Sequence, residues 1–495
     1  MKKIILSFAF IMSLFVQANA GGLVTNSNQS ATYFRMLARG ASLSGDAVYY
    51  NPAGLAFLDD GLTISLNTQM IWMQRTLTND LSTFNAHLGK TQNNEFIGKL
   101  YVPVFPGLYA AYKKGNWSFS LGFNPPAGGG SVEFANGLPM LEKDVSRIPG
   151  SLTSAGLTTT NYSMQAMMKG SSIVYGVQAG ASYKINEVLG VFGGVRMLFA
   201  ANSYEGYLKD VRVNPRNDAL PGNILNGEML GVAELNAKGD AINNMANSFP
   251  DPADPTALML KGVATGLKSV ASQITDKALD VSQKGNGFAP LIGVHFKTGN
   301  LNLAAKYEFR AKITLTSDPK QDDLGMYPKD KKLRSDVPAL LSIGGSYDIV
   351  PALKLSATYI HHFEPQASIE SWTAQTIVKR QDLIDRGTNE YMAGLEWKPL
   401  KKLIISTGCQ WSDVGVSDDW QNDITHNMDN FTMGIGLGYH FNDRLTLNIG
   451  GINTWYKASS VKSDVYPPYS SVSLPYTQTY NRTNRAVAIG IDYRF

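Results

Sequence analysis

Apolar and polar residues alternate along the last stretch of the chain. Two sets of residues take turns there: Val487, Ile489, Ile491 and Tyr493 with Ala488, Gly490, Asp492 and Arg494. A period of two residues is typical of a β-strand whose two faces meet different surroundings. The same alternation recurs within 301–309, 353–359, 391–397 and 431–441. The pattern therefore predicts an all-β chain.

The links between these predicted strands are alternately short and long. The short links lie at 113–116, 185–187, 297–300, 348–351, 398–401 and 442–443. The long links lie near 77–98, 125–172, 205–286, 316–335, 363–386, 413–428 and 458–480. Short periplasmic turns and long extracellular loops alternate in this way in outer-membrane barrels. We therefore expect residues 61–495 to form a transmembrane antiparallel β-barrel of about 14 strands, with both ends of the chain on the periplasmic side.

The composition fits a barrel better than other classes of protein. Only 17% of the residues are charged, 44% are hydrophobic, and 47 are glycines. The mean hydropathy is −0.13, and the only long apolar run stands at the start of the chain, which argues against a polytopic helical membrane protein. Aromatic residues are too common for a disordered chain. The single cysteine, Cys409, excludes an intramolecular disulfide, so closure of the barrel must hold the fold.

Both ends of the chain carry signs of export to an outer membrane. Residues 1–20 are typical of a signal peptide, with Lys2 and Lys3, an apolar core from Ile4 to Val16, and Ala18-Asn19-Ala20 before the cleavage site. A retained anchor helix is the alternative. The last strand resembles that of bacterial outer-membrane barrels, whose terminal aromatic residue, here Phe495, directs the barrel-assembly machinery. We expect a monomer among outer-membrane lipids. The basic residues are scattered, which argues against nucleic-acid binding.

The residues that precede the first strand are rich in Ser, Gly and Asn. Three short elements stand out: Gly40-Ala41-Ser42, Gly45-Asp46-Ala47 and Asn51-Pro52-Ala53-Gly54-Leu55. Pro52 and Gly54 favour a tight turn. Small polar residues can pack inside a polar lumen, so we expect residues 21–60 to form a luminal hatch. The segment is short for the plug domain of an energised receptor, which favours passive transport.

Two of the long loops carry apolar residues in distinctive patterns. Within 255–284, apolar side chains recur at helical spacing, namely Leu260, Val263, Leu267, Val270 and Ile274, and Pro255 could begin the helix. This helix could pack on the mouth of the barrel, form the wall of an apolar collecting groove, or do both. The stretch 138–170 contains Met140, Met164, Met167 and Met168. Methionine adapts to variable apolar shapes, so these residues are candidates to contact a hydrophobic ligand.

On the three N-terminal elements and on Trp117–Phe134, the chain resembles the outer-membrane long-chain fatty acid transporter family (FadL/TodX type). The Asn-Pro-Ala element lies in that family's hatch, just ahead of the first strand. The family's third strand has a kink that contains glycine, and the matching stretch here comprises Asn124, Pro125, Pro126, Ala127, Gly128, Gly129 and Gly130. The chain departs from the family in Gly54-Leu55 and in the length of its 205–286 loop.

The resemblance implies a route for an apolar solute. Loop helices would capture a long-chain fatty acid or another apolar small molecule, which descends to a pocket above the hatch. Movement of the hatch would release it sideways through a gap in the wall. The residues give this gap a physical reason, because Pro125 and Pro126 lack amide hydrogens and Gly128–Gly130 permit a bend. The alternative is that the stretch is only the end of the strand. No cofactor or metal is expected.

Charged residues at inward positions have two possible uses. Lys306, Glu308, Arg310, Glu390 and Asp492 could hold the hatch, through salt bridges among themselves, or could meet a ligand carboxylate. Other functions remain as alternatives. A general porin would need no hatch, and an aromatic-hydrocarbon importer would share the architecture. A haem receptor could use His361, His362 or His426. An outer-membrane hydrolase, for which His361, His362 and Glu364 would be the candidates, is the least favoured. The sequence does not name the ligand.

Overall fold

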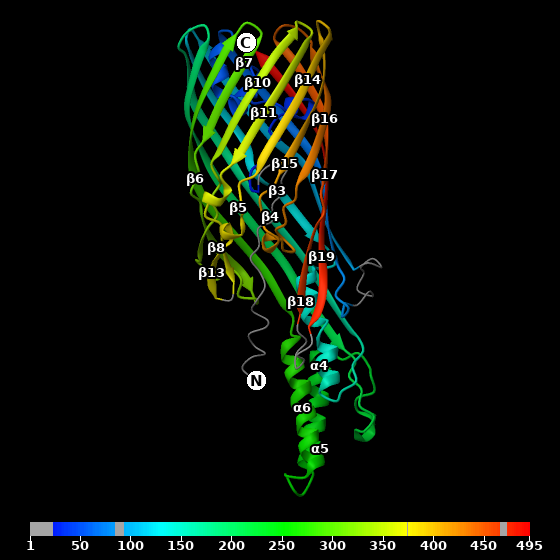
Figure 1. Ribbon diagram of the computed structural model, residues 1–495. Coiled ribbons are helices and arrows are strands. Elements are labelled where there is room, and N and C mark those ends of the chain that lie inside the picture. The colour runs from blue at the N-terminus through cyan, green and yellow to red at the C-terminus, as the bar shows by residue number, and fades with distance from the viewer. Residues whose placement is uncertain (1–22, 85–93, 374, 466–472) are drawn as a thin grey trace.

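Fourteen antiparallel strands form a closed barrel in the computed structural model, which describes residues 23–84, 94–373, 375–465 and 473–495 (Figure 1). The barrel strands are β1 (Gly61–Asn79), β2 (Glu95–Lys114), β3 (Trp117–Phe134), β4 (Tyr162–Lys184), β5 (Leu189–Val213), β6 (Lys277–Thr298), β7 (Leu301–Glu308), β10 (Leu340–Val350), β11 (Leu353–His362), β14 (Asn389–Leu400), β15 (Leu403–Asp413), β16 (Asn430–His440), β17 (Leu445–Tyr456) and β19 (Leu474–Arg494). The barrel closes where β1 pairs with β19, from Thr63 opposite Arg494 to Asn79 opposite Gln478. The predicted strand number is therefore confirmed.

The alternation of the sequence places one set of side chains outside and the other inside. On β19, Val487 and Ile489 are exposed, whereas Ala486 and Ala488 are buried. Exposed apolar side chains continue around the outer surface, for example Leu303 on β7 and Ile435 on β16. The six predicted short turns all join neighbouring barrel strands. Among the described residues, no helix is long and apolar enough to cross a membrane.

Further strands and helices extend the end of the barrel that carries the long loops. The strands are β8 (Thr314–Asp322), β9 (Lys332–Arg334), β12 (Glu370–Thr373), β13 (Thr376–Lys379) and β18 (Ser459–Val465). The 3-10 helices of these loops are η3 (Pro221–Asn223), η4 (Glu364–Gln366), η5 (Arg380–Leu383) and η6 (Asp418–Trp420). The α-helices are α3 (Pro139–Val145), α4 (Ile148–Ser154), α5 (Val232–Asn247) and α6 (Pro255–Gln273).

Helices α5 and α6 form a hairpin that projects beyond the long-loop end (Figure 1). Helix α6 begins at Pro255, and the side chain of Asp254 caps it by accepting from the amides of Thr256 and Ala257. The apolar spacing predicts this helix correctly. Helix α5 is not apparent from the pattern because its apolar positions alternate with Gly239, Asn236 and Asn243. β6 begins at Lys277, nine residues before the expected end of the 205–286 link at residue 286.

Residues 23–58 lie inside the barrel and are here called the N-terminal luminal segment (Figure 1). The segment contains α1 (Ala31–Arg35), α2 (Ala47–Tyr50) and η2 (Pro52–Phe57), and nearly all of its residues are buried. The signal peptide assigned to residues 1–20 lies outside the described residues, as do parts of the first and last long links. The luminal segment divides the lumen into a part toward the long loops and a part toward the short turns.

Candidate functional site

Glycines of the inner wall let the backbone of α1 lie directly against the strands. A Cβ atom on Gly450 would stand 2.6 Å from Arg35 N and 2.7 Å from the carbonyl carbon of Phe34. One on Gly434 would stand 2.5 Å from Phe34 O, and one on Gly408 would stand 2.8 Å from Leu37 N. Only a residue without a side chain permits this approach. The inward glycines of β15–β17 therefore form a bed that fits α1.

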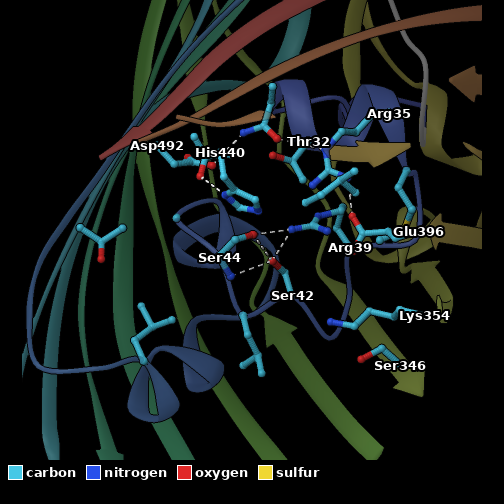
Figure 2. Close-up of a pocket in the computed structure, with 18 of the residues that line it drawn as sticks. Thr32, Arg35, Arg39, Ser42, Ser44, Ser346, Lys354, Glu396, His440 and Asp492 are labelled. Atoms are coloured by element: carbon cyan, nitrogen blue, oxygen red, sulfur yellow. Dashed lines mark hydrogen bonds and ion pairs between the residues drawn. The ribbon is translucent and has the colours of Figure 1, made fainter. Parts of the chain in front are cut away.

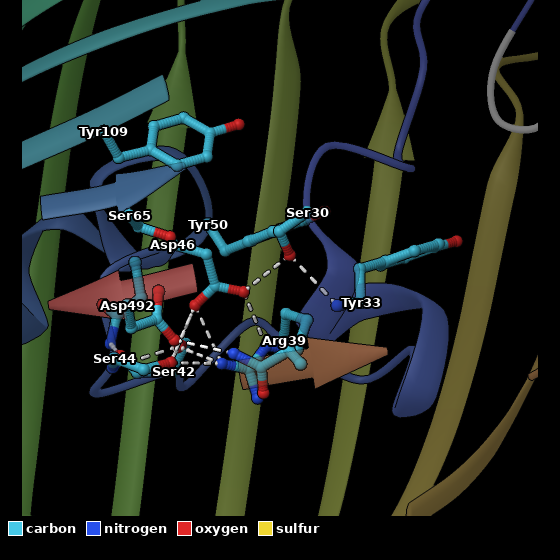
Figure 3. A network of polar contacts seen from close by, with 12 residues as sticks. Ser30, Tyr33, Arg39, Ser42, Ser44, Asp46, Tyr50, Ser65, Tyr109 and Asp492 are labelled. Atoms are coloured by element: carbon cyan, nitrogen blue, oxygen red, sulfur yellow. Dashed lines mark hydrogen bonds and ion pairs between the residues drawn. The ribbon is translucent and has the colours of Figure 1, made fainter. Parts of the chain in front are cut away.

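An ion pair and a ring of hydroxyls hold the middle of the luminal segment together (Figure 3). Arg39 Nη2 donates to Asp46 Oδ1 at 2.8 Å, and Arg39 Nε donates to Asp46 Oδ2 at 3.0 Å. Ser42 and Ser44 donate to the same carboxylate at 2.7 and 2.9 Å, and Ser30 donates at 2.9 Å. Burial acts to raise the pKa of Asp46, but the charge and hydrogen bonds of Arg39 outweigh it and lower that pKa. The Gly-Asp element thus supplies the central acceptor of the segment.

The Asn-Pro-Ala element fastens the end of the segment to the wall. Asn51 Nδ2 donates to Ser42 O at 2.9 Å and lies 2.9 Å from His295 Nδ1 of β6. Pro52 O accepts from Ser182 Oγ of β4 at 2.7 Å, and Ala53 is fully buried. The glycines earlier in the segment also lie against the wall: a Cβ on Gly40 would meet Thr358 and one on Gly45 would meet Ser65.

Wall charges bind the segment at several points, some of which the sequence indicates. Lys306 Nζ donates to Tyr49 O at 2.8 Å, and Ser27 donates to Glu390 at 2.8 Å. Asp492 accepts from Asn448 at 2.8 Å. In contrast, Arg310 lies away from the segment, 3.7 Å from Asp336 in the loops.

Three arginine ion pairs of the lumen are absent from the sequence-based candidates. Arg35 pairs with Glu396 and Arg196 pairs with Glu308, each at 2.5 Å, and Arg39 pairs with Asp46. Arg196 and Lys306 also lie over the ring of Tyr49, each 4.8 Å from its centroid. Alternation could place Arg196 inward, but the partner of each arginine depends on contacts between distant parts of the chain.

The ladder between β2 and β3 is interrupted where β3 bends. The two strands pair from Lys114–Trp117 to Leu108–Phe123 and again at Lys99–Glu133 and Gly98–Phe134, but not in between. In the interval, residues 124–129 of β3 are all buried, so the in–out alternation is lost. Gly128 and Gly130 have φ angles of 73° and 116°, in the region that favours glycine. The bend thus lies within β3, which continues to Phe134, and not at the end of the strand.

The N-terminal luminal segment takes up hydrogen bonds that β2 leaves open. Asn26 N donates to Pro126 O at 2.8 Å, and Gly128 N donates to Val24 O at 3.4 Å. Thr25 forms an antiparallel bridge with Ala127, and the Asn26 amide group donates to Gly128 O. Gly129 lies buried between these contacts and Gly130. Residues 24–26 therefore act as a short strand that covers the bend from inside.

The lumen differs on the two sides of the luminal segment. Toward the long loops, buried apolar side chains form what we call the luminal apolar cluster. It includes Met73, Leu77, Phe96, Leu100, Val132, Phe134, Met168, Tyr204, Leu279, Ile424, Met428 and Tyr480. Toward the short turns lies a polar cavity of about 380 Å³ (Figure 2). Its charged lining comprises Arg35, Arg39, Lys354, Lys398, Arg444, Arg494, Glu396, Asp443 and Asp492.

The apolar loop residues singled out from the sequence lie in two different clusters. Met168 belongs to the luminal apolar cluster, and Met140 packs against it. The others that point inward lie in a second cluster at the base and interface of the α5–α6 hairpin: Met164, Leu260, Leu267 and Val270, with Val263 packed at its edge. Met167 stands on the opposite face of β4 from Met164 and Met168. The structure therefore does not bring all these residues to one surface.

The histidines near the rim take part in contacts with the luminal segment. His362 Nδ1 lies 3.0 Å from Thr25 Oγ1, and Glu364 accepts from Leu23 N at 2.5 Å. His361 lies 2.8 Å from Asn389 Oδ1, on the other face of β11. Within the described residues, no three His, Cys, Asp or Glu side chains are grouped so that they could hold a metal ion.

Solved structures with the same architecture exist at low sequence identity. A Pseudomonas aeruginosa FadL homologue matches with a TM-score of 0.63 at 13% identity, over 96% of this chain and 100% of that chain. The chain has the FadL fold. Two further structures with this fold are the Pseudomonas putida toluene transporter TodX (TM-score 0.54, 14% identity, 95% of this chain and 99% of that chain) and the Ralstonia pickettii toluene transporter TbuX (TM-score 0.51, 13% identity, 95% and 99%).

No protein-family model and no curated protein sequence matches the chain. The FadL fold thus confirms the fold expected from the short motifs, while the roles of individual residues must be argued from the structure itself.

Proposed function

We propose that this chain is an outer-membrane channel for the passive uptake of hydrophobic compounds, and that long-chain fatty acids are its main substrates. The single observation that carries the proposal is the break in the β2–β3 ladder together with the strand of the luminal segment that covers it. A barrel wall normally pairs every backbone group, because an unpaired group in lipid is costly. A break that is closed by a separable segment is an opening that can be uncovered.

The two parts of the lumen support a sideways exit. An apolar solute gains free energy by leaving water for the luminal apolar cluster. It would lose that gain in the polar cavity on the short-turn side, whose lining is charged. The β3 bend opens toward the bilayer from the level between the two parts. Lateral release of the substrate into the membrane therefore avoids the polar cavity.

In this proposal the N-terminal luminal segment is the hatch. Asp46, Asn51 and the wall glycines keep most of the segment in place, while residues 24–26 are joined to the bend by few hydrogen bonds. A local shift of residues 24–26 would uncover the opening without removing the rest of the segment. Gly40, Gly45, Pro52 and Ala53 belong to the part that stays.

Capture of the substrate takes place at the long-loop end. Met140 and Met168 lie against the luminal apolar cluster and form the entrance side. Leu260, Leu267 and Val270 are already buried between α5 and α6, so their role is to stiffen the hairpin that borders the entrance. The exposed apolar belt and the terminal aromatic Phe495 suit insertion as a monomer by the barrel-assembly machinery.

A reversible lock on the bend tests the proposal. Thr25 and Ala127 are antiparallel bridge partners, and such partners have Cα atoms about 4.5–5.5 Å apart, within the range of a disulfide. We expect Thr25→Cys/Ala127→Cys, in a Cys409→Ser background, to lose most uptake of a fluorescent fatty acid when oxidised. Reduction with dithiothreitol should restore it. The assay uses cells that lack their own fatty-acid channel.

A matched pair elsewhere in the lumen controls for the crosslink itself. Thr432 of β16 and Thr454 of β17 are register partners whose hydroxyls lie 2.9 Å apart. Thr432→Cys/Thr454→Cys should form a disulfide and leave uptake unchanged, since these strands are already paired. Undiminished uptake by the oxidised Thr25→Cys/Ala127→Cys protein, with the crosslink verified by mass spectrometry, would rule out exit at the bend.

A further inference from the structure

Two arginines face each other inside the barrel at the seam between its first and last strands. Arg75 of β1 and Arg482 of β19 are register partners, and their side chains are 1% and 3% exposed. Gln69, which binds Asn28 of the luminal segment, stands six residues earlier on β1. Six residues of strand span roughly 20 Å. The arginine pair therefore lies well toward the long-loop end of the lumen.

Both guanidinium groups bind neutral carbonyls of the link between β15 and β16, which folds into the lumen. Arg75 Nη1 donates to Ile424 O at 2.8 Å, and Arg482 Nη2 donates to His426 O at 2.7 Å. The Nε and Nη2 atoms of Arg75 are buried and have no hydrogen-bond partner among the described residues. Two adjacent donors of one guanidinium group thus point at a position that the described protein atoms leave unfilled.

No carboxylate within the described residues forms an ion pair with Arg75. Asp423, the acidic residue of the same link, instead accepts from Met140 N at 2.6 Å and from the side chain of Gln478. The stretches of chain outside the described residues contain no Asp or Glu at all. The positive charge of the pair is therefore not balanced by an acidic side chain at this point of the lumen.

Other luminal arginines show what a balanced site looks like here. Arg35, Arg39 and Arg196 each make an ion pair with a buried carboxylate. A buried charge without a counter-ion is strongly unfavourable. The effect of the unbalanced pair extends to His426 beside it, because burial and the charges of Arg75 and Arg482 lower the pKa of His426 well below its usual value.

The surroundings of the arginine pair are apolar. Met73 and Leu77 flank Arg75 on the inward face of β1, and both belong to the luminal apolar cluster. Tyr480, Ile424 and Met428 are members of the same cluster. A ligand that filled the open donors of Arg75 would have an anionic head, and the rest of it would lie among apolar side chains.

We propose that Arg75 and Arg482 bind the carboxylate head of an acyl-chain acid on its way through the lumen. The inference rests on the proposed function and specifies its substrate class. Nε and Nη2 of Arg75 match the two oxygens of a carboxylate in a side-on, bidentate arrangement. Arg482 adds a second positive charge, and the acyl chain extends into the luminal apolar cluster. The channel would then select acids over neutral hydrocarbons of equal length.

Binding to the purified full-length barrel in a non-ionic detergent tests this site. The ligands are hexadecanoate, hexadecanol and hexadecyl phosphate, which share one tail and differ in the head. We expect hexadecanoate to bind most tightly, and Arg75→Met to weaken it roughly 10- to 100-fold, as expected for lost hydrogen bonds to a charged group. Hexadecanol should bind equally to both proteins. Arg75→Lys should keep part of the preference, because it keeps the charge but not the bidentate geometry.

Arg485→Met is the matched control. Arg485 stands three residues from Arg482 on β19, but it faces outward and donates to Asn453 at 3.2 Å. Its replacement should leave the affinity for hexadecanoate unchanged. A merely structural role of Arg75 makes a different prediction: Arg75→Met would lower the thermal stability of the barrel and weaken hexadecanoate and hexadecanol alike.

The outcomes separate this inference from the proposed function. Equal loss of acid and alcohol binding in Arg75→Met, or no loss of either, would overturn the carboxylate site while uptake and its block by the Thr25–Ala127 crosslink remain. Tighter binding of hexadecyl phosphate than of hexadecanoate would overturn it in favour of a phosphorylated lipid. If the unaltered protein bound none of the three ligands and took up no fatty acid, the proposed function itself would fail.

Discussion

The two parts of the lumen, on either side of the N-terminal luminal segment, are made from the same strands but from different residues. Toward the long loops, inward positions of β1, β2 and β3 carry Met73, Leu100 and Val132. Toward the short turns, inward positions of β11, β14 and β19 carry Lys354, Glu396 and Asp492 (Figure 2). A single barrel thus contains an apolar chamber and a polar one in series.

The difference teaches where transport must turn. In a porin a uniform polar lumen offers water throughout, and a solute crosses from end to end. Here an apolar solute meets favourable surroundings only as far as the luminal segment. The boundary between the two parts coincides with the level at which the β2–β3 ladder is broken. The partition, the break and its cover are therefore parts of one arrangement, and three changes test how far the partition depends on the segment.

Removal of residues 23–58 should have the largest effect. Without the segment the two parts of the lumen join, and the inner wall keeps its polar and glycine-lined bed open to water. We expect the deletion protein to conduct ions steadily in planar bilayers, whereas the complete protein should not. The temperature at which the band shifts on denaturing gels reports whether the barrel is folded. A folded deletion protein without conductance would show that the segment does not separate the two parts.

Gly450→Val should disturb the partition less. The added side chain would meet the backbone of Arg35 and Phe34 at 2.6 and 2.7 Å, and overpacking of this kind costs about 1–3 kcal/mol. We expect faster hydrogen exchange in α1 and intermittent conductance. Gly451→Val is the control, since the nearest atoms to its Cβ stand at 3.8 Å, an ordinary contact. Equal exchange rates in the two variants would contradict the proposed fit between α1 and the glycine bed.

Val132→Thr should have the smallest effect. Val132 is 1% exposed in the luminal apolar cluster, and a buried hydroxyl without a partner costs about 1–3 kcal/mol. A ligand that must displace or desolvate this hydroxyl should enter several-fold more slowly in the cellular uptake assay. Ser346→Ala, in the polar cavity, should leave uptake unchanged. The opposite ranking of the two variants would mean that the substrate passes through the polar cavity.

The barrel itself could be read from the sequence because its pattern is local. Period-two alternation and short turns depend on residues close together in the chain, and they give the strand number, both end positions and the six hairpins correctly. The start of α6 at Pro255 is equally local. The fold of Gly128 and Gly130 into a bend is indicated by their composition, but the continuation of β3 to Phe134 is not, since it depends on pairing with Thr25 and Asn26.

The charges of the lumen show the limit of sequence reasoning. Alternation predicts that Arg75 and Arg482 point inward, but their contacts come from the link that contains Ile424, which returns to the lumen from far along the chain. In the same way, nothing in the vicinity of Arg310 shows that it turns to Asp336 in the loops. The separation of Met168 from Leu267 into different clusters depends on how the α5–α6 hairpin stands on the barrel, which periodicity does not determine.

The glycine bed of α1 also bears on how the barrel is built. The segment touches both flanks of the closing seam: Ala31 N donates to Asn67 of β1, and Arg35 donates to Asn448 of β17, next to β19. Bringing together the first and last strands is entropically the most demanding pairing in the fold, since it closes the longest loop. A segment that binds both flanks makes its own insertion and the closing of the seam one cooperative event. Each glycine of the bed is then a condition for assembly as well as for transport.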